Sequence, residues 1–307
     1  MNAFRFKIRF AKPITLQGQE QTIREGVLIE QRGQWAEASP LPGFSAETID
    51  DVIAALRGLQ PPPASLQFAL ESLETPLESS KPAPISVPWN YLLLGDRKQV
   101  LNDVENCIQT KCRAVKLKVG RGDLSAEVEL VKEVRKRLPD QVQLRLDANQ
   151  AWSLEEAVTF FDAVEGVDLQ YVEEPLQDSN LLEELYARTG ARYALDETLL
   201  RERQIEAWPN VVALVCKPTI LGGRDRIQQL VATGKPVIFS AAFESGVGVA
   251  RIAQLAAELS PEHAAGLDTL GWLADDLLMQ SPKKQDDMFV VPATLDVAKA
   301  KLEAIEL

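Results

Sequence analysis

Five charged residues recur along the middle of the chain at similar intervals. They are Lys118, Asp147, Glu173, Asp196 and Lys217, and each lies at or near the end of a short apolar, β-branched run. The intervals suit a strand, a helical crossover and two loops, since the crossover alone takes about a dozen or more residues. Charged side chains at the C-terminal ends of successive parallel strands are typical of the active site of a closed (β/α) barrel.

Two lysines share the first of these runs. Lys116 and Lys118 lie two residues apart, so both side chains point to the same face of a strand. Two ammonium groups inside a barrel are costly unless carboxylates or a metal compensate them. Each should depress the pKa of the other, and a lysine near neutrality can act as a general base. The alternative is an exposed edge strand with two solvated lysines.

The three carboxylates Asp147, Glu173 and Asp196 would repel one another at adjacent strand ends unless a cation lay between them. Hard oxygen ligands with no nearby His or Cys favour Mg²⁺ or Mn²⁺ over zinc. Lys217 should end a strand on the far side of this cation from Lys118. The alternative is that the acids cap helices or pair with lysines at the barrel rim.

Composition narrows the possible functions. The net charge of −12 argues against a nucleic-acid partner, and no apolar run is long enough to predict a transmembrane helix. Met1–Phe10 alternates apolar and basic residues, which predicts a strand and not a signal peptide. The three cysteines, Cys107, Cys112 and Cys216, show no paired spacing, so we expect reduced thiols in a cytoplasmic protein. The single histidine, His263, leaves acid–base work to Lys, Asp or Glu.

The first part of the chain has an α+β pattern, which predicts a separate domain over residues 1–84. The pattern alone does not place the tail 282–307, which we expect to join this domain as a cap over the barrel. The expected tail elements are a run at Met288–Pro292 and a short helix near Leu295–Ala304. The expected N-terminal elements are strands at Met1–Phe10, Gly26–Glu30 and Gly33–Ala38, a polar loop at Thr15–Thr22 that covers substrate, and helices over about 46–59 (N-cap Ser45) and 65–77.

Residues 85–281 alternate strands with amphipathic helices, which predicts the barrel domain, and Lys81–Pro84 is the expected linker. Leu124–Leu138 is one such helix, with apolar residues at spacings of three and four. Eight strands are expected, near Ile85–Leu94, Ala114–Val119, Val142–Asp147, Leu169–Val172, Tyr193–Leu195, Ala213–Cys216, Pro236–Ser240 and Ala264–Leu267.

The order Lys-x-Lys, Asp, Glu, Asp, Lys at successive strand ends resembles the muconate-lactonising subgroup of the enolase superfamily. Within that subgroup, Ala36–Ser45, Arg145, Ser240–Ser245 and Gly266–Thr269 resemble motifs of the o-succinylbenzoate synthase family. The likeness covers nearly the whole chain. It implies a TIM-like barrel with a cap, which acts on a small carboxylate substrate with Mg²⁺.

The resemblance also implies residue roles. Lys118 would remove the proton α to the substrate carboxylate and then protonate the departing hydroxyl in a syn elimination. Lys217 would stabilise the enediolate, and the metal would be bound by Asp147, Glu173 and Asp196, as in other enolase-superfamily sites. Strand alternation leaves open whether Glu173 or Glu174 faces the metal.

The resemblance also implies four substrate-binding residues, which are Lys116, Arg145, Asn149 and Ser240. The family prefers Ser where this chain has Ala241 and Ala242. The sequence therefore leaves open which residues contact the succinyl group at these positions. The implied reaction converts 2-succinyl-6-hydroxy-2,4-cyclohexadiene-1-carboxylate to o-succinylbenzoate, a step toward menaquinone and phylloquinone.

The main alternative is an N-acylamino acid racemase or a dipeptide epimerase, with Lys118 and Lys217 as opposed bases. A dipeptide epimerase should carry acids at the eighth strand end to hold an ammonium group, and this chain has only Asp268 there, with Gly266 at the other position. A non-catalytic binding barrel should have lost one of the five charged residues, and none is missing. The oligomeric state does not follow from the sequence.

Overall fold

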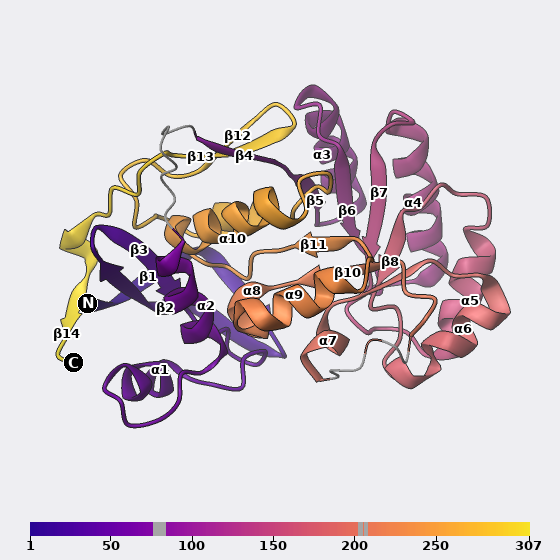
Figure 1. Cartoon of the computed structure of the whole chain (residues 1–307). Helices are drawn as coiled ribbons and strands as arrows, with labels where there is room; N and C mark the ends of the chain where they lie inside the picture. The colour runs from indigo at the N-terminus through magenta and orange to yellow at the C-terminus, as the bar shows by residue number, and fades with distance from the viewer. Residues whose placement is uncertain (76–83, 202–204, 206–207) are drawn as a thin grey trace.

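The computed structural model describes residues 1–75, 84–201, 205 and 208–307, and Figure 1 shows their arrangement. Its strands form a four-stranded sheet, a seven-stranded sheet and a three-stranded sheet. Residues 81–83 of the expected linker and the end of the expected helix 65–77 lie outside the described residues. Within the described residues, no helix is both long and apolar enough to cross a membrane.

The N-terminal sheet has the order β14-β1-β2-β3. Its strands are β1 (Asn2–Leu16), β2 (Gln19–Gln31), β3 (Gln34–Ala38) and β14 (Glu303–Ile305). The expected loop at Thr15–Thr22 was wrong, because Leu16 pairs with Gln19 across a two-residue turn. Gln17 and Gly18 have φ of 47° and 76°, as a tight hairpin turn requires.

Two helices, α1 (Ile49–Leu56) and α2 (Ala64–Glu74), pack on this sheet. The N-cap of α1 is Thr48, and the expectation of Ser45 was wrong. Thr48 forms a capping box with Asp51, while the Ser45 hydroxyl accepts a hydrogen bond from the Leu41 amide at 2.9 Å. The observed N-cap lies three residues after the expected one, so α1 begins later than predicted.

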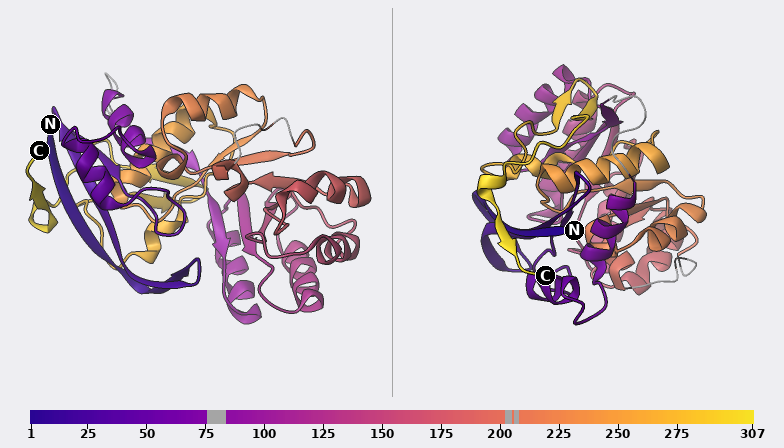
Figure 2. Two further views of the ribbon diagram at one scale, coloured as in Figure 1. Left: turned by 90° about the horizontal axis from the view of Figure 1, so that it is seen from below. Right: turned by 60° about the vertical axis from the view of Figure 1, so that its left-hand side comes forward.

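The seven-stranded sheet is parallel and has the order β11-β10-β9-β8-β7-β6-β5. Figure 2 shows it curling while helices cover its outer face. The strands are β5 (Asn90–Leu93), β6 (Ala114–Lys118), β7 (Gln143–Asp147), β8 (Tyr171–Glu173), β9 (Tyr193–Leu195), β10 (Ala213–Cys216) and β11 (Val237–Phe239). The helices along it are α3 (Arg97–Gln109), α4 (Leu124–Arg137), α5 (Leu154–Ala163), α6 (Leu182–Thr189), α7 (Glu197–Arg201), α8 (Pro218–Leu221), α9 (Arg224–Ala232) and α10 (Gly246–Leu259).

The expected eighth strand, Ala264–Leu267, is not a strand but closes the barrel. Ala265 bridges Trp89 and Gly266 bridges Ser240, so this segment joins the two edge strands through isolated pairs. The expected strand Ile85–Leu94 also divides, because its first half turns away as β4 (Ile85–Pro88) and pairs with β13 (Met288–Val291). β12 (Lys283–Gln285) completes that three-stranded sheet.

The end of the chain returns to the N-terminal sheet. The expected helix Leu295–Ala304 was wrong: only a 3₁₀ turn at Lys299–Lys301 forms, and β14 then pairs antiparallel with residues Ala3–Arg5 of β1. Figure 1 shows both termini at this edge. Long-range pairing of an edge strand leaves no local periodicity, which is why the pattern of the tail did not predict it.

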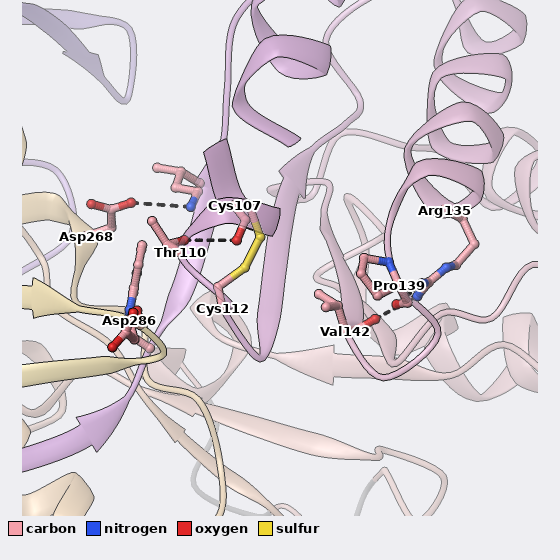
Figure 3. The surroundings of a disulfide bond; sticks show 10 residues. Cys107, Thr110, Cys112, Arg135, Pro139, Val142, Asp268 and Asp286 are labelled. Carbon is pink, nitrogen blue, oxygen red and sulfur yellow. Dashed lines mark hydrogen bonds between the residues drawn. A yellow bond between two sulfur atoms is a disulfide. The ribbon is translucent and has the colours of Figure 1, made fainter. Parts of the chain in front are cut away.

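The cysteine expectation was wrong for two of the three residues. Cys107, in the last turn of α3, forms a disulfide with Cys112, and their Cα atoms lie 5.7 Å apart (Figure 3). The chain reverses after α3 to enter β6, and this reversal brings the two residues together. Cys216 is a buried free cysteine at the end of β10.

Candidate active site

The register of the parallel strands brings the charged residues to one end of the barrel. Lys118 pairs with Asp147, and Asp147 pairs with Glu173 across β6, β7 and β8. Asp196 directly follows β9, and Lys217 directly follows β10. The five residues therefore line the C-terminal ends of adjacent strands, where active sites of parallel barrels lie.

Lys116 bridges two of the carboxylates from within the barrel. Its Nζ atom lies 2.9 Å from Asp147 Oδ2 and donates to Glu173 Oε1 and Oε2 at 3.1 and 3.2 Å. The Asp147 and Glu173 side chains are each 1% exposed, so these are buried ion pairs. The two-residue spacing of Lys116 and Lys118 gives both the same inward face, as expected.

Lys118 lies nearer to solvent, and two groups hold its amine. Lys118 Nζ donates to Asp147 Oδ2 and to Asn149 Oδ1, both at 2.6 Å. Asn149 has a φ of 46°, a left-handed conformation that asparagine tolerates. Its backbone amide donates to Asp147 Oδ1 at 3.1 Å. The turn after β7 therefore aims Asn149 at the amine of Lys118.

The structure separates the two neighbouring glutamates. Glu173 faces the lysines, whereas Glu174, with a φ of 44°, turns its side chain to the start of α7. Glu174 accepts hydrogen bonds from the amides of Asp196 and Thr198 at 2.6 and 2.7 Å. Glu173 therefore belongs to the charged cluster, whereas Glu174 binds the backbone that follows β9.

Burial and charge shift the pKa values of this cluster. Burial, and then the nearby charge of Asp147, raise the pKa of Glu173 to about 8. Burial alone would lower the pKa of Lys116, but Asp147, Glu173 and Asp196 outweigh it and hold that pKa well above its usual value. The expected depression of the Lys116 pKa was therefore wrong, because the charges of the three carboxylates outweigh burial.

The other side of the site consists of Lys217 and Asp196, which form a short ion pair. Burial opposes the charged amine of Lys217, but Asp196 and then Glu197 outweigh it and raise its pKa. Burial raises the pKa of Asp196 to about 6, although Lys217 opposes that shift.

Glu197, at the start of α7, was not anticipated from the sequence. Its side chain is buried, and Oε1 accepts a hydrogen bond from Asn149 Nδ2 at 3.2 Å. Its Oε2 atom is buried without a hydrogen-bond partner. The only signal in the sequence was a second acid directly after Asp196.

The donor set fits a divalent cation. Asp147, Glu173, Asp196 and Glu197 carry the kind of oxygen atoms that Mg²⁺ prefers, and one buried Glu197 oxygen has no hydrogen-bond partner. In the described residues, however, no three His, Cys, Asp or Glu side chains are grouped so that they could hold a metal ion as they stand. Lysine amines lie between these carboxylates instead.

Two further predicted substrate residues are buried in the barrel. Arg145 is fully buried, donating to Asn90 Oδ1 at 3.1 Å, to the Ala264 carbonyl at 2.7 Å and to Gln170 Oε1 at 2.6 Å. These contacts tie three barrel segments together, while Arg145 Nη2 is buried without a hydrogen-bond partner, and its role toward substrate stays a prediction. Ser240 follows β11 and is 7% exposed beside Gly266.

Comparisons with known proteins show which family the chain resembles. A family model described as Enolase C-terminal domain-like matches residues 99–295. The chain is 31% identical over 290 residues to the o-succinylbenzoate synthase of Yersinia pseudotuberculosis serotype O:1b (strain IP 31758), a match that covers 87% of this chain and 89% of the relative.

Solved structures share the fold. The o-succinylbenzoate synthase of Thermosynechococcus elongatus BP-1, complexed with Mg in its active site, has a TM-score of 0.77 at 23% identity and covers 91% of this chain and 95% of its own. The L-Ala-D/L-Glu epimerase of Bacillus subtilis, in a substrate-liganded complex, has a TM-score of 0.78 at 20% identity, with 99% and 98% covered. At such identities these structures establish the fold alone.

The fold and the charged site together define a capped (β/α) barrel of the enolase type, as the sequence predicted. The matched model spans most of the barrel, and the relative is similar along nearly the whole chain. The chain belongs to the o-succinylbenzoate synthase family of the enolase superfamily.

Proposed function

We propose that this protein is a lyase that dehydrates 2-succinyl-6-hydroxy-2,4-cyclohexadiene-1-carboxylate to o-succinylbenzoate. The observation that carries the proposal is the arrangement of Lys118 and Lys217. They end strands β6 and β10, and the carboxylates of the intervening strands lie between them. Two amines that face one another across a set of carboxylates can act on a substrate that carries both an acidic C–H and a carboxylate.

We assign the metal to Asp147, Glu173 and Asp196, with Mg²⁺ as the ion and Mn²⁺ as the nearest alternative for oxygen ligands. When bound, the ion supplies positive charge that polarises the substrate carboxylate and favours loss of the neighbouring proton. Burial and then the charge of Asp147 raise the pKa of Glu173, so a cation bound beside it would favour its ionised form.

The remaining steps belong to the amines. Lys118 Nζ, oriented by Asp147 and Asn149, takes the proton α to the carboxylate and returns a proton to the hydroxyl that leaves from the same face. Lys217, kept charged by Asp196, stabilises the negative charge that develops on the carboxylate.

For the substrate we retain Asn149 and Ser240 as contacts and assign Arg145 a different role. Arg145 donates to acceptors on three other barrel segments, and its guanidinium lies over the Tyr171 ring at 5.5 Å. We infer that it supports the barrel wall beneath the amines. The cap, residues 1–84 with 282–307, would close over the succinyl end of the substrate.

The epimerase alternative needs a free acid at the end of the eighth segment to hold an ammonium group. Asp268 is the acid at that place, and it is already engaged. It forms an ion pair with Lys284, and its Oδ2 accepts the Leu92 amide at 3.4 Å. Since Gly266 supplies no second acid, this end of the barrel favours a substrate without an ammonium group.

The test is turnover of the cyclohexadiene substrate with Mg²⁺, followed by ultraviolet absorbance. We expect wild type and the exposed-lysine control Lys132→Ala to consume substrate and Lys118→Ala to be inactive. Activity in Lys118→Ala would refute its role as the base. Inactive wild type that exchanges the α-proton of N-acylamino acids or dipeptides into deuterated water would refute the dehydratase and support the racemase alternative.

The proposal also includes the pathway and the location of the enzyme in the cell. The product belongs on the route to quinones of the menaquinone and phylloquinone type, and we place the enzyme in the cytoplasm with no nucleic-acid or membrane partner. The disulfide between Cys107 and Cys112 does not support the reduced-thiol argument for that location. Fractionation of cells that express the tagged protein tests it directly.

A further inference from the structure

The segment that leads from β11 into α10 is held by the N-terminal sheet. It comprises residues 240–245 and contains Ser240, one of the proposed substrate contacts. Figure 1 shows α10 running toward β3 of that sheet, and the two elements are in contact. Because the segment joins a barrel strand to this helix, whatever holds the first turn of α10 also holds the segment.

A buried carboxylate from β3 caps that first turn. Glu37 is 1% exposed and accepts hydrogen bonds from the Ser245 amide at 3.1 and 3.2 Å and from the Gly248 amide at 3.1 Å. The Ser245 hydroxyl also donates to it, and the Ser39 hydroxyl donates to it at 2.7 Å. The first amides of a helix have no partner within the helix, and its dipole favours an anion there.

The helix start is built around this carboxylate. A Cβ atom on Gly248 would lie 2.6 Å from Glu244 Cβ and 3.0 Å from Glu37 Oε2, so the close approach requires glycine. Asp276, in a segment that packs against β1, accepts the Gly246 amide at 2.7 Å. Glu37 and Asp276 therefore cap the same helix start, and Glu37 comes from the N-terminal sheet itself.

A second contact from the same sheet fixes the middle of the segment. Phe243 has a φ of 64°, a left-handed conformation that is strained for a bulky residue. The buried Arg24 of β2 donates from Nε to the Phe243 carbonyl at 3.1 Å and from Nη1 to the Pro40 carbonyl at 2.6 Å. The Phe243 ring packs edge-on against Phe10 of β1 with centroids 5.6 Å apart.

We propose that Glu37 is a positioning residue for the substrate, which sets the geometry of residues 240–245 by anchoring the first turn of α10 to the N-terminal sheet. This inference rests on the proposed function, in which Ser240 contacts the substrate. Glu37 itself does not touch the amines or the strand-end carboxylates. Its loss should weaken substrate binding and leave the chemical step intact, because an interaction shared by ground state and transition state affects KM more than kcat.

The experiment compares Glu37→Gln with Glu25→Gln, a matched change on an ion-paired glutamate of the same sheet. Steady-state kinetics with the cyclohexadiene substrate and Mg²⁺ should give a KM about tenfold higher for Glu37→Gln with kcat within about twofold, the scale of one lost charge-assisted hydrogen bond. Hydrogen–deuterium exchange should be faster at residues 240–249 in Glu37→Gln alone. Wild-type KM and wild-type exchange in Glu37→Gln would overturn the proposal.

Two further results keep the test decisive. If Glu37→Gln does not fold, Ser39→Ala removes one donor to the carboxylate, and we expect the same changes at a smaller scale, about two- to threefold. Unchanged kinetics and exchange in Ser39→Ala would then count against the role of Glu37. A wild type without turnover would refute the proposed function, while the exchange at residues 240–249 would still confirm or overturn the anchoring.

Discussion

Replacing Asp147 by Asn should abolish the response of the protein to Mg²⁺. Asp147 is 1% exposed, accepts hydrogen bonds from Lys118 at 2.6 Å and lies 2.9 Å from Lys116 Nζ, so it is central among the proposed ligands. Second-sphere changes already weaken metal sites by about 10–100-fold, so loss of a ligand charge should weaken this one by at least about a hundredfold.

That loss converts into a measurable stability difference. At a Mg²⁺ concentration of about 100 times the wild-type Kd, binding stabilises wild type by about 2.7 kcal/mol. The same concentration would stabilise Asp147→Asn by only about 0.4 kcal/mol, because its Kd would then equal the concentration used. Chemical denaturation with and without Mg²⁺ measures both values, and turnover measures the functional loss.

The control is Asp140→Asn, a change at an exposed position between α4 and β7. It should keep the full stabilisation by Mg²⁺ and the full activity. If Asp147→Asn kept Mg²⁺-dependent stabilisation and turnover at the wild-type level, the assignment of the strand-end carboxylates as ligands would be refuted. Loss of activity with intact Mg²⁺ stabilisation would instead move Asp147 from the metal to the orientation of Lys118.

Two other predictions concern Lys217 at the active site and Glu37 at the start of α10. Lys217→Ala should lower kcat by about 10²–10³-fold, because it removes a charge that stabilises the developing negative charge, and calorimetry should still detect Mg²⁺ binding. Glu37→Gln should change how stability depends on pH. Burial raises the pKa of Glu37 from 4.5 to about 7, with Glu244 adding to the shift and Ser245, Ser39 and Arg24 opposing it. The folded state then holds this proton more tightly than the unfolded state, so the free energy of unfolding of wild type should fall by about 3 kcal/mol relative to Glu37→Gln as the pH rises from about 4.5 through 7. Urea denaturation at several pH values measures that difference, and parallel curves would contradict it.

The sequence allowed the charged site to be predicted because parallel strands repeat a simple rule. Each strand ends at the same edge of the sheet, so residues that close successive apolar runs become neighbours in space. Tyr193–Leu195 and Ala213–Cys216 were predicted with their observed bounds for the same reason. The metal and base roles of these residues remain predictions.

Features that depend on a single backbone turn or on distant pairing were missed. The left-handed conformation of Glu174 breaks strand alternation, so no periodic pattern could assign Glu173 and Glu174 to their faces. The turn at Gln17–Gly18 lies within a polar stretch that resembles a loop, and β14 acquires its partner from the other end of the chain. The contacts of Arg145 with Gln170, Asn90 and Ala264 also come from distant parts of the chain, so they could not be read from its place two positions before Asp147.

The division between shared and specific parts of the site explains why related barrels differ in reaction. Under the proposed function, the lysines and carboxylates at the strand ends remove the proton next to a carboxylate, and both elimination and epimerisation begin with that step. The fate of the resulting enediolate depends on the groups around the rest of the substrate. In the proposed site of this chain those groups lie on residues 240–245, which Glu37 and Arg24 hold by hydrogen bonds, and near Asp268, which pairs with Lys284. A change of reaction would therefore require changes in these segments and their anchors while the charged strand ends stayed the same.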